Sequence, residues 1–408
     1  MSLIMERIET DIIVAGAGLA GLTAAARLAA EGFGVVCVDP RPVMAESDDQ
    51  RTTAFLMPAI ATFERAGAWS AMAEGATPLM TMRIVSAEGG ARGVPGTPRA
   101  VTDFDAREIG DQPFGYNVEN AAARRALIGA IEASANAQLI DGVAVTDLWR
   151  QSEGVTAALA DGRRIEGRLA VAADGRDSRL RQEAGIAARR WQYGQRALVF
   201  AVTHAEPHRH VSTEIHRPGG PLTLVPLPDR DGRPCSSIVW LNDAALSHQL
   251  AALDDAALAE RLRADTMDLF GAFEIAGPRA HWPIIGQLAT RLRARRLALV
   301  GETAHVIPPT GAQGANMSLG DIEALADALA AARQHAGDIG AEAVLARYER
   351  RRFPEMAARV GGIDMLNRFV DTPFAPAAAL RRTVLDTVGR VAPLRQAVMR
   401  LGLGAGRA

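Results

Sequence analysis

Three glycines near the N-terminus, Gly16, Gly18 and Gly21, have the spacing of a phosphate-binding turn. They follow a short apolar run at residues 10–15 and precede a helical pattern at residues 19–30. Glycine at these positions permits a tight turn, lets the backbone approach a pyrophosphate, and lets the helix pack closely on the strand. The helix N-terminus adds unpaired N–H groups and the positive end of its dipole. The spacing predicts a dinucleotide site; the alternative is a glycine-rich turn without a ligand.

Asp39 adds a second contact to this site. It ends the next apolar run, residues 34–39, and follows Gly21 by 18 residues. An acid near this distance accepts hydrogen bonds from an adenosine ribose in βαβ units of this kind. Strand, helix and acid are therefore all in place, although the motif does not distinguish FAD from NAD.

Two later segments have the composition of binding loops. Residues 171–181, VAADGRDSRLR, place Asp174 in a turn between an apolar run and a helical pattern, which on its own is an ordinary strand-to-helix turn. Residues 301–321, GETAHVIPPTGAQGANMSLGD, combine small side chains with two adjacent prolines. Glycine allows close approach to the backbone and proline fixes its path. His305 in this loop has the chemistry of a general base, but we interpret it as a histidine that pins the loop by hydrogen bonding.

The elements that must position these loops follow from the hydrophobic pattern. Residues 141–174 contain short apolar runs broken by SEG and DG, which predict a three-stranded meander with a hairpin turn at Asp161-Gly162. Residues 197–241 alternate again and predict a second, mostly antiparallel sheet. Residues 254–270 read as a helix with an acidic start, and the chain from about Glu342 is helical and rich in arginine. The second sheet is therefore expected to be inserted into the nucleotide fold.

Composition excludes several functional classes. The chain has 408 residues and a net charge of −2, which argues against nucleic-acid binding. It contains no lysine, so a Schiff-base lysine and a P-loop lysine are both excluded. Cys37 and Cys235 support neither a disulfide framework nor a cysteine metal site and fit a reducing cytoplasm. We interpret Cys37 as a packing residue.

Histidines and apolar runs add two further expectations. His204, His208, His210 and His216 cluster in the predicted second sheet, where surface histidines are a better interpretation than a metal site, so we predict no metal. No signal peptide is apparent, and no apolar run approaches the roughly 20 residues of a spanning helix. We expect a cytoplasmic protein, with peripheral contact at the inner face of the membrane as an open alternative.

The whole chain resembles the class A flavin-dependent aromatic monooxygenases, which have the p-hydroxybenzoate hydroxylase fold. The resemblance rests on the DG turn after the meander and on GETAHVIPPTGAQGAN, in the right order. Within that group the sequence is most similar to the ubiquinone-biosynthesis hydroxylases. The segments that indicate this are RTTAFLMPAIATFERAGAW, YNVENAAARRAL and the tail YERRRFPEMAARVGGIDMLNRF with PLRQAVMRLGLG.

The resemblance implies an α/β fold in three parts. A Rossmann-like FAD-binding domain would comprise residues 5–80, 112–187 and 285–345. A mostly antiparallel β substrate domain would comprise 81–111 and 188–284, and a C-terminal helical region 346–408.

The resemblance also implies hydroxylation of an apolar aromatic ring, a ubiquinone-biosynthesis intermediate. NAD(P)H would act as a transient co-substrate, and O₂ would form a flavin C4a-hydroperoxide. The single GxGxxG fits a nicotinamide without a Rossmann domain of its own. Two alternatives stay open: a flavin reductase or dehydrogenase of the prenyl-chain reductase type, and a non-catalytic flavoprotein that acts as an assembly partner.

The resemblance assigns FAD contacts but no catalytic residue. Gly16, Gly18 and Gly21 would hold the pyrophosphate and Asp39 the adenosine ribose. Arg51 would reach the pyrophosphate or flavin side, and Val145 would lie near adenine. Asn120 and Glu302 would lie along the ribityl chain, and Asp174 would belong to a motif that touches FAD and the nicotinamide. The full set of predicted contacts is Gly16, Ala17, Gly18, Ala20, Gly21, Asp39, Arg41, Arg51, Asn120, Val145, Asp174, Gly301, Glu302, Pro308, Gly311, Gln313, Gly314, Ala315 and Asn316.

The loop composition suits a flavin, because a flat ring is approached by backbone at its edge and face. Residues 311–316 would line the isoalloxazine ring, and the N–H groups of residues 314–316, which open the next helix, would stabilise negative charge on it.

The sequence also departs from the family pattern. Glu302 stands where the family usually has Asp, and Ala121 follows Asn120 where Arg is common. The chain has only three tyrosines, so a tyrosine proton relay is not assumed.

The C-terminal region alternates apolar and basic residues, which predicts either an interfacial face for a membrane or a biosynthetic complex, or a helix packed on its own core. The residues concerned are Phe369, Phe374, Leu380, Leu385 and Leu394 with Arg381, Arg382, Arg390 and Arg395.

Overall fold

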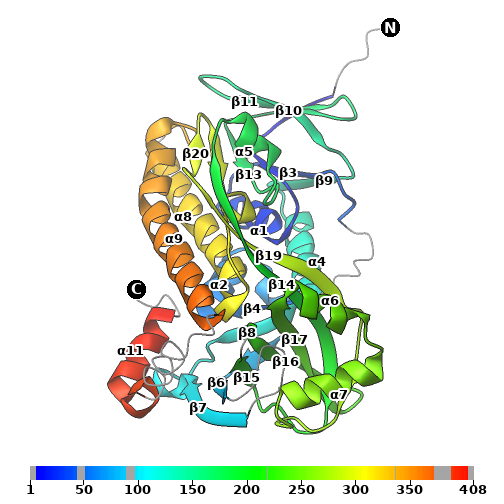
Figure 1. Ribbon diagram of the computed structural model, residues 1–408. Coiled ribbons are helices and arrows are strands. Elements are labelled where there is room, and N and C mark those ends of the chain that lie inside the picture. Colours follow the sequence, from blue (N-terminus) through cyan, green and yellow to red (C-terminus); the bar gives the residue numbers. More distant parts are fainter. Residues whose placement is uncertain are drawn as a thin grey trace.

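The computed structural model describes residues 6–43, 51–88, 97–217, 219–335, 337–371 and 387–402. Figure 1 shows an upper part, in which helices pack on a parallel sheet, and a lower part built on a second sheet. The α/β class and the C-terminal helical part agree with the prediction. The predicted domain boundaries stay a prediction. The second sheet continues into the upper part through strand β19 (Ala280–Ala289) and strand β22 (His305–Val306).

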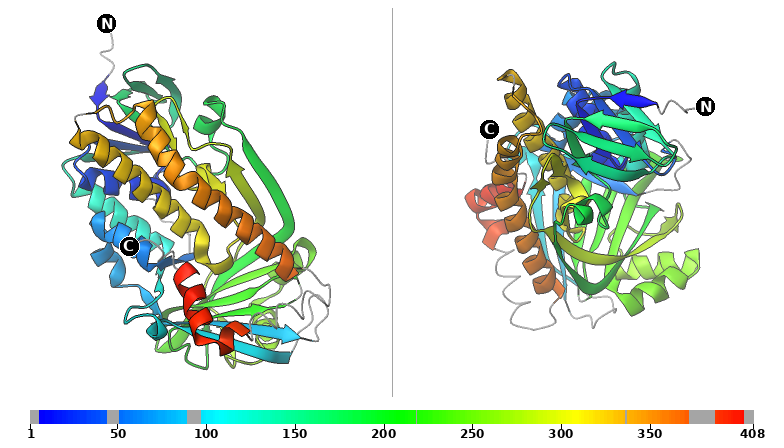
Figure 2. Two further views of the ribbon diagram at one scale, coloured as in Figure 1. Left: turned by 90° about the vertical axis from the view of Figure 1, so that its left-hand side faces the viewer. Right: turned by 90° about the horizontal axis from the view of Figure 1, so that it is seen from above.

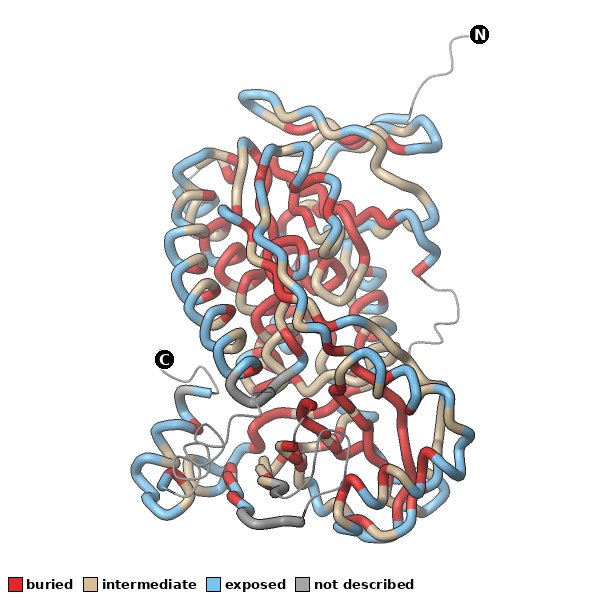
Figure 3. Tube along the Cα trace, in the orientation of Figure 1, coloured by how far each residue is buried: buried red, intermediate tan, exposed pale blue. Residues whose placement is uncertain are grey.

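The upper sheet has the order β20-β21-β13-β2-β3-β9, and the pairs from β21 to β9 are parallel. Its strands are β2 (Ile12–Ala15), β3 (Val35–Asp39), β9 (Ala137–Asp141), β13 (Leu169–Ala172), β20 (Arg293–Ala294) and β21 (Leu297–Leu299). Strands β2, β3, β13 and β21 are continuous apolar runs and fully buried, as expected for a parallel sheet covered on both faces. Figure 3 shows this core as buried trace in the middle of the upper part.

Helices α1 (Leu19–Ala30), α4 (Asn120–Glu132) and α8 (Gln313–Gln334) contribute to this core. Cys37 lies on β3 and is fully buried, which confirms its interpretation as a packing residue. The βαβ unit predicted around the three glycines is therefore β2, α1 and β3.

The meander consists of β10 (Val145–Arg150), β11 (Val155–Leu159) and β12 (Arg164–Gly167), with a hairpin turn in which Gly162 has φ +93°. Strand β1 (Arg7–Glu9) extends it in parallel to β12. One expectation was wrong: the run RLAVA is not the third strand of the meander. It forms β13 in the upper sheet, because a wholly apolar strand is buried better between β2 and β21 than on a small surface sheet.

The lower sheet has the order β22-β19-β14-β17-β16-β15-β6-β7 and is mostly antiparallel, as predicted. The exception is the parallel pair β15–β6, which joins distant parts of the chain. Its further strands are β6 (Thr81–Glu88), β7 (Thr97–Asp105), β14 (Ala188–His204), β15 (Val211–His216), β16 (Leu222–Arg230), β17 (Arg233–Asp243) and β18 (Phe273–Ile275), which pairs with β14. The register of β14 shifts between Gln192 and Arg196, where Gly194 has φ +71°.

Helices α6 (Ala244–Ala252) and α7 (Asp255–Asp265) pack on the lower sheet over a cluster around Phe200, Ile238 and Trp240. Helix α7 falls within the predicted acidic-start helix, and the side chain of Asp254 caps it. A small sheet, β4 (Thr52–Leu56), β8 (Gly115–Glu119) and β5 (Thr77–Leu79), lies between the two larger ones in Figure 1.

Helix α9 (Glu342–Asp371) runs along α8, and helix α11 (Ala392–Gly402) lies near its lower end (Figure 2). Val388 and Met399 pack against Phe104 and Phe114, and Arg395 pairs with Glu108 at 2.7 Å. The C-terminal helix is therefore packed on its own core along one side. Of the predicted interfacial residues, Phe374, Leu380, Arg381, Arg382 and Leu385 lie outside the described residues, as does the placement of the Phe369 side chain.

Candidate functional site

The three glycines differ in what surrounds them. Gly16 has φ +104°, and a Cβ there would lie 2.4 Å from the carbonyl oxygen of Ala173. A Cβ on Gly21 would lie 1.7 Å from the carbonyl oxygen of Gly16. A Cβ on Gly18 would meet nothing within 4 Å. Two glycines are therefore required by the fold, whereas Gly18 borders open space at the start of α1.

Asp39 braces this turn. Its Oδ2 accepts a hydrogen bond from the Ala17 N–H at 2.6 Å, and its Oδ1 accepts one from the Arg41 N–H at 2.9 Å. Asp39 is buried, whereas the Arg41 side chain is largely exposed, with Nε 3.7 Å from the carboxylate. A carboxylate has about four acceptor positions, so Asp39 can still accept bonds from a ribose. The Val143 N–H donates to the Asp39 carbonyl at 3.1 Å, which places the segment leading to Val145 beside this strand end.

Asp174 connects two loops. It follows β13 and precedes the short helix α5 (Arg179–Glu183), whose Leu180 N–H donates to Asp174 Oδ2 at 3.1 Å. The Thr303 hydroxyl donates to Asp174 Oδ1 at 3.3 Å and accepts from the Gly175 N–H at 3.2 Å. The loop after β13 and the loop after β21 are thus joined directly.

Glu302 points at a partner that the sequence did not indicate. Its carboxylate is half exposed and pairs with the guanidinium of Arg176 at 3.0 Å. Arg176 belongs to the DGRDS turn, so the pair adds a second link between the two loops. The predicted contact of Glu302 with the ribityl chain stays a prediction.

A buried ionic hub holds the 301–306 loop. His305 Nε2 lies 2.8 Å from Asp321 Oδ2, which also accepts from the Gly301 N–H at 3.1 Å. Arg352 Nε donates to Asp321 Oδ1 at 2.5 Å and its Nη2 donates to the Met317 carbonyl at 2.8 Å. Burial opposes ionisation of Asp321, but the charges of His305 and Arg352 outweigh it and hold the pKa of that carboxyl below its usual range. His305 therefore pins the loop, which confirms its interpretation.

Asp321 and Arg352 were missed from the sequence as partners of that loop. The available signal was an acid at the centre of the apolar stretch MSLGDIEAL, where an unpaired carboxylate is costly.

The loop before α8 has an unusual backbone. Gly311 and Ala312 have φ +63° and +55°, so two consecutive residues are left-handed. Asn316 stabilises this path: its Oδ1 accepts from the Leu56 N–H at 2.8 Å, and its Nδ2 donates to the carbonyls of Ala54 and Ala312. Gln313 accepts from Arg359 at 2.9 Å and Pro308 is buried. The N–H groups of Gly314, Ala315 and Asn316 lie in the first turn of α8, as predicted.

Arg51 and Asn120 meet at the small sheet. The Asn120 N–H donates to the Arg51 carbonyl at 2.9 Å, and the Thr53 hydroxyl donates to Asn120 Oδ1 at 2.7 Å. The guanidinium of Arg51 lies 5.5 Å from the ring centre of Trp282 on β19. Arg51 thus stands between the start of β4 and the lower sheet.

Four of these segments gather at one edge of the upper sheet. The glycine turn follows β2, Asp39 ends β3, Asp174 follows β13 and Gly301 follows β21. The carboxyl ends of parallel strands lie at the same edge, where open α/β sheets bind ligands. Open space at Gly18, acceptor positions on Asp39 and N–H groups at the start of α8 fit the phosphate, ribose and ring of a long cofactor such as FAD.

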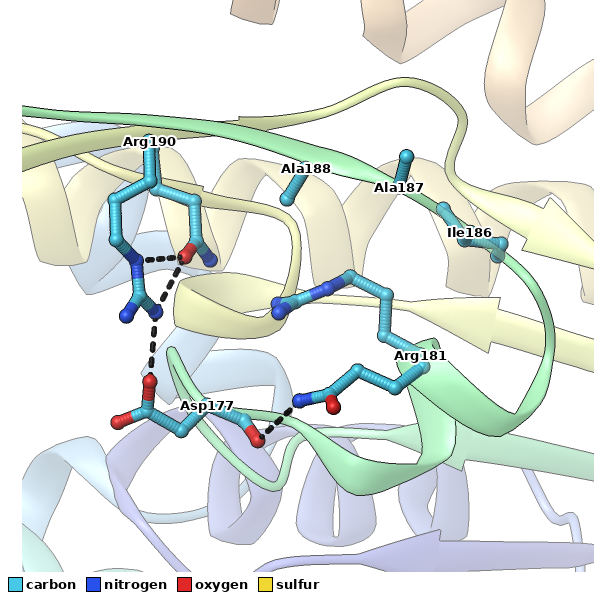
Figure 4. Close-up of a pocket in the computed structure, with 8 residues that line it drawn as sticks. Asp177, Arg181, Ile186, Ala187, Ala188 and Arg190 are labelled. Atoms are coloured by element: carbon cyan, nitrogen blue, oxygen red, sulfur yellow. Dashed lines mark hydrogen bonds and ion pairs between the residues drawn. The ribbon is translucent and has the colours of Figure 1, made fainter.

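A pocket of about 280 Å³ lies next to the Asp174 loop (Figure 4). It is lined by Asp177, Arg181, Gln182, Ile186, Ala187, Ala188, Arg190 and Gln287. Arg190 donates to Asp177 at 2.8 Å and to Gln287 at 2.7 Å. Arg181 donates to the Thr303 carbonyl at 2.8 Å, and burial together with the charge of Arg190 lowers its pKa. The pocket therefore offers two guanidinium groups beside one carboxylate.

One face of the lower sheet is apolar near Trp282. Ala197, Val199, Leu241 and Ile284 form a cluster there, to which Tyr193, Val239 and Trp282 add half-buried side chains.

Two of the three tyrosines donate their hydroxyl protons to partners within the protein. The Tyr193 hydroxyl donates to Asp364 at 2.7 Å, and burial and this bond raise its pKa above the usual range. Tyr348 is buried and donates to the Leu299 carbonyl at 2.7 Å.

The histidines of the lower sheet have structural partners. His204 is fully buried and lies 2.9 Å from the Ser236 hydroxyl, which corrects its interpretation as a surface residue; a ring that bonds at both nitrogens can be buried. His208 lies beside the Leu227 carbonyl, and His216 lies beside the Glu214 carboxylate. Within the described ranges, no group of His, Cys, Asp and Glu side chains could hold a metal ion, and no helix is long and apolar enough to cross a membrane.

Comparisons with known proteins agree with this arrangement. The family described as "FAD binding domain" matches residues 9–361. Ubiquinone hydroxylase UbiL of Rhodospirillum rubrum is 34% identical over 397 residues, which cover 97% of this chain and 89% of the relative. The 3-demethoxyubiquinol 3-hydroxylase of Escherichia coli is 28% identical and covered over its full length, with 98% of this chain aligned. The crystal structure of p-nitrophenol 4-monooxygenase PnpA from Pseudomonas putida has the same fold, with a TM-score of 0.79 and 20% identity over 99% of this chain and all of that one. This chain belongs to the FAD binding domain family.

Proposed function

We propose that this protein is an FAD-dependent monooxygenase that hydroxylates an apolar aromatic ring in an intermediate of ubiquinone biosynthesis. NAD(P)H and O₂ are the co-substrates. The observation that carries the proposal is the gathering of four strand-end segments beside the apolar face of the lower sheet. Strand β22, which ends the 301–306 loop, pairs with β19, the strand that carries Trp282 of that face. The names of the two relatives, a ubiquinone hydroxylase and a 3-demethoxyubiquinol 3-hydroxylase, support the substrate class.

The residues would share the binding of FAD as follows. Gly18 and the α1 N-terminus take the pyrophosphate, Asp39 takes the adenosine ribose and Val145 lies near adenine. Asn120 and Glu302 lie along the ribityl chain, with Arg51 on the phosphate or flavin side. When bound, FAD supplies the redox chemistry that NAD(P)H drives and that activates O₂.

The protein's own contribution is positioning and electrostatics. The N–H groups in the first turn of α8 point from a helix N-terminus and stabilise negative charge on a ring edge. Ala54, Leu56 and Ala312 fix that turn through Asn316. The apolar cluster on the lower sheet orients the substrate ring and excludes water from it.

The pocket beside Asp174 suits the phosphates of NAD(P)H. Arg181 and Arg190 provide positive charge there, and Gln287 links the pocket to the Glu302 carbonyl at 3.2 Å. A site of this kind serves a nucleotide that binds transiently, since the chain has only one GxGxxG turn. Peripheral association with a membrane or a biosynthetic complex is also proposed, and its surface is argued below.

The test uses the purified protein with FAD, NAD(P)H and a prenylated phenol. We expect the product to gain one oxygen atom, measured by mass spectrometry with ¹⁸O₂. Substrate-dependent H₂O₂ release without that product would favour a reductase or dehydrogenase. Failure of NAD(P)H to reduce the bound FAD with any ligand would favour a non-catalytic flavoprotein. Mass spectrometry of the quinone intermediates that accumulate on deletion of the gene would identify the substrate.

A further inference from the structure

Helix α11 has two apolar sides, and only one of them is covered. Val388, just before the helix, and Met399 pack into the cluster around Phe104 and Phe114. Val391, Leu394 and Val398 are exposed. These three positions have the spacing i, i+3, i+7 and so form one stripe along the surface. Pro393 and Ala397 beside them are also exposed, so this side of the helix is mostly apolar.

Contacts to the lower sheet fix the direction in which this stripe faces. Arg395, which lies between the stripe and Met399 around the helix, donates hydrogen bonds to Glu108 at 2.7, 2.9 and 3.0 Å. Glu108 belongs to the turn that follows β7. The stripe therefore cannot turn inward without breaking the ion pair and exposing Met399.

The segment that carries the stripe has charged residues of one sign only. Residues 387–402 contain Arg390, Arg395 and Arg400 and no acid, although the whole chain has a net charge of −2. Arg390 and Arg400 are exposed and stand near the two ends of the stripe. An apolar face flanked by basic residues is the composition of a helix that lies in the surface of an anionic bilayer.

We propose that the stripe formed by Val391, directly before helix α11, and by Leu394 and Val398 on that helix is a docking surface for an anionic lipid membrane. Among the described residues no helix could span a bilayer, so contact through this part of the chain would be peripheral. The end of α9, on the same side of the molecule in Figures 1 and 2, exposes Met365 and Leu366 as well. A second copy is a poorer occupant, because two such stripes would bring like charges together.

The experiment is co-sedimentation of the full-length, FAD-loaded protein with vesicles. One set is pure phosphatidylcholine and the other an equal mixture of phosphatidylcholine and phosphatidylglycerol. We expect binding to the mixed vesicles only, and weaker binding as salt is raised. Leu394→Ser should lower the partition coefficient about tenfold and Arg400→Gln about fivefold.

The controls match these residues in exposure. Leu269, after α7, is 41% exposed, as is Leu394, so Leu269→Ser should bind vesicles like the parent. Arg125 is exposed on α4, and Arg125→Gln should also have no effect. Equal binding of Leu394→Ser and the parent would overturn the proposal. So would a dimer in sedimentation equilibrium that Leu394→Ser dissociates, since a second copy would then cover the stripe. Vesicle binding is measured without turnover, so its failure is independent of the proposed reaction.

Discussion

In the glycine turn, the fold itself requires glycine at positions 16 and 21, whereas only a ligand would require glycine at position 18. A Cβ on Gly21 would collide with the Gly16 carbonyl, whereas a Cβ on Gly18 has open space. We expect Gly21→Ala to lower the melting temperature of the apoprotein. Gly18→Ala should leave that temperature unchanged and weaken FAD about tenfold or more, because the methyl group occupies the side of the turn where the phosphate approaches. Calorimetry of the apoproteins and fluorescence titration with FAD would check both. Unchanged FAD affinity in Gly18→Ala would contradict the proposed placement of the pyrophosphate.

Glu302 has two possible partners, and their effects can be separated. If it accepts hydrogen bonds from the ribityl chain, Glu302→Ala should weaken FAD roughly ten- to a hundredfold, since a charge-assisted bond contributes about 1.5–3 kcal/mol. Glu302→Asp should stay within a few-fold of the parent, and Glu302→Gln should fall between. Arg176→Ala removes the observed ion pair but leaves the carboxylate. An equal loss of FAD affinity in Arg176→Ala and Glu302→Ala would show that Glu302 acts only through Arg176.

Single residues were predictable where local sequence fixes their position. The glycine spacing and Asp39 could be placed because strand, turn and helix are contiguous in the chain. The Arg176–Glu302 pair could not, because it depends on a side-chain direction across 126 residues. The same holds for the hub at Asp321, whose partners come from the loop at Gly301 and from α9.

At the scale of elements, Asp321 joins α8 to α9 and to the 301–306 loop. Its removal leaves the buried Arg352 without a counter-charge, so Asp321→Ala should cost about 3–5 kcal/mol of unfolding free energy. Asp327 and Arg351 form an exposed pair between the same two helices. Asp327→Ala should cost about 0–1 kcal/mol. Urea unfolding of the three proteins would measure this, and similar losses in both variants would show that the hub adds nothing beyond a surface pair.

The same hub predicts how stability depends on pH. The pKa of Asp321 in the folded state lies below its usual value, so its contribution is present above about pH 4. It is lost as pH falls through the folded-state pKa, because the unfolded chain then binds the proton more readily. We expect the difference in stability between the parent and Asp321→Asn to shrink below pH 4. A difference that stays constant down to pH 2 would contradict the ionised state of this carboxyl.

The sequence predicted the type of these helices and strands, but not always the strand with which each one pairs. Period-2 alternation identified the antiparallel lower sheet and the meander, and the long arginine-rich pattern identified α9. The parallel pairing of β6 with β15 could not be predicted, since its residues are more than 100 positions apart and neither strand carries a signal for the other. The length of β14 was also missed, because its polar first half, ARRWQYGQR, lacks the apolar alternation of its second half.

At the scale of the whole molecule, the pocket at Arg190 lies where the upper part meets the lower sheet. Arg190 and Gln287 come from β14 and β19, and Asp177 and Arg181 from the segment after β13. We expect Arg190→Ala to raise the KM for NAD(P)H about tenfold, because one charge-assisted contact is lost. The affinity for FAD should stay unchanged. Arg189 precedes it on the same strand and lies over the Trp191 ring instead, so Arg189→Ala is the matched control. Parent-like KM values in Arg190→Ala would remove this pocket from the nucleotide path.

The strand order of the upper sheet also determines when each strand gains its neighbours during translation. Strand β2 is the first strand of this sheet to be synthesised, and its neighbour β13 follows about 157 residues later. Strand β21, which pairs with the other side of β13, begins about 285 residues after Ile12. A ribosome that adds about 5–20 residues per second needs roughly 15 to 60 seconds to cover that interval. During this time one apolar edge of the nascent sheet, first that of β2 and then that of β13, has no native partner and is open to aggregation. A fragment that stops before Leu297 is therefore expected to be insoluble even though it contains the entire nucleotide turn.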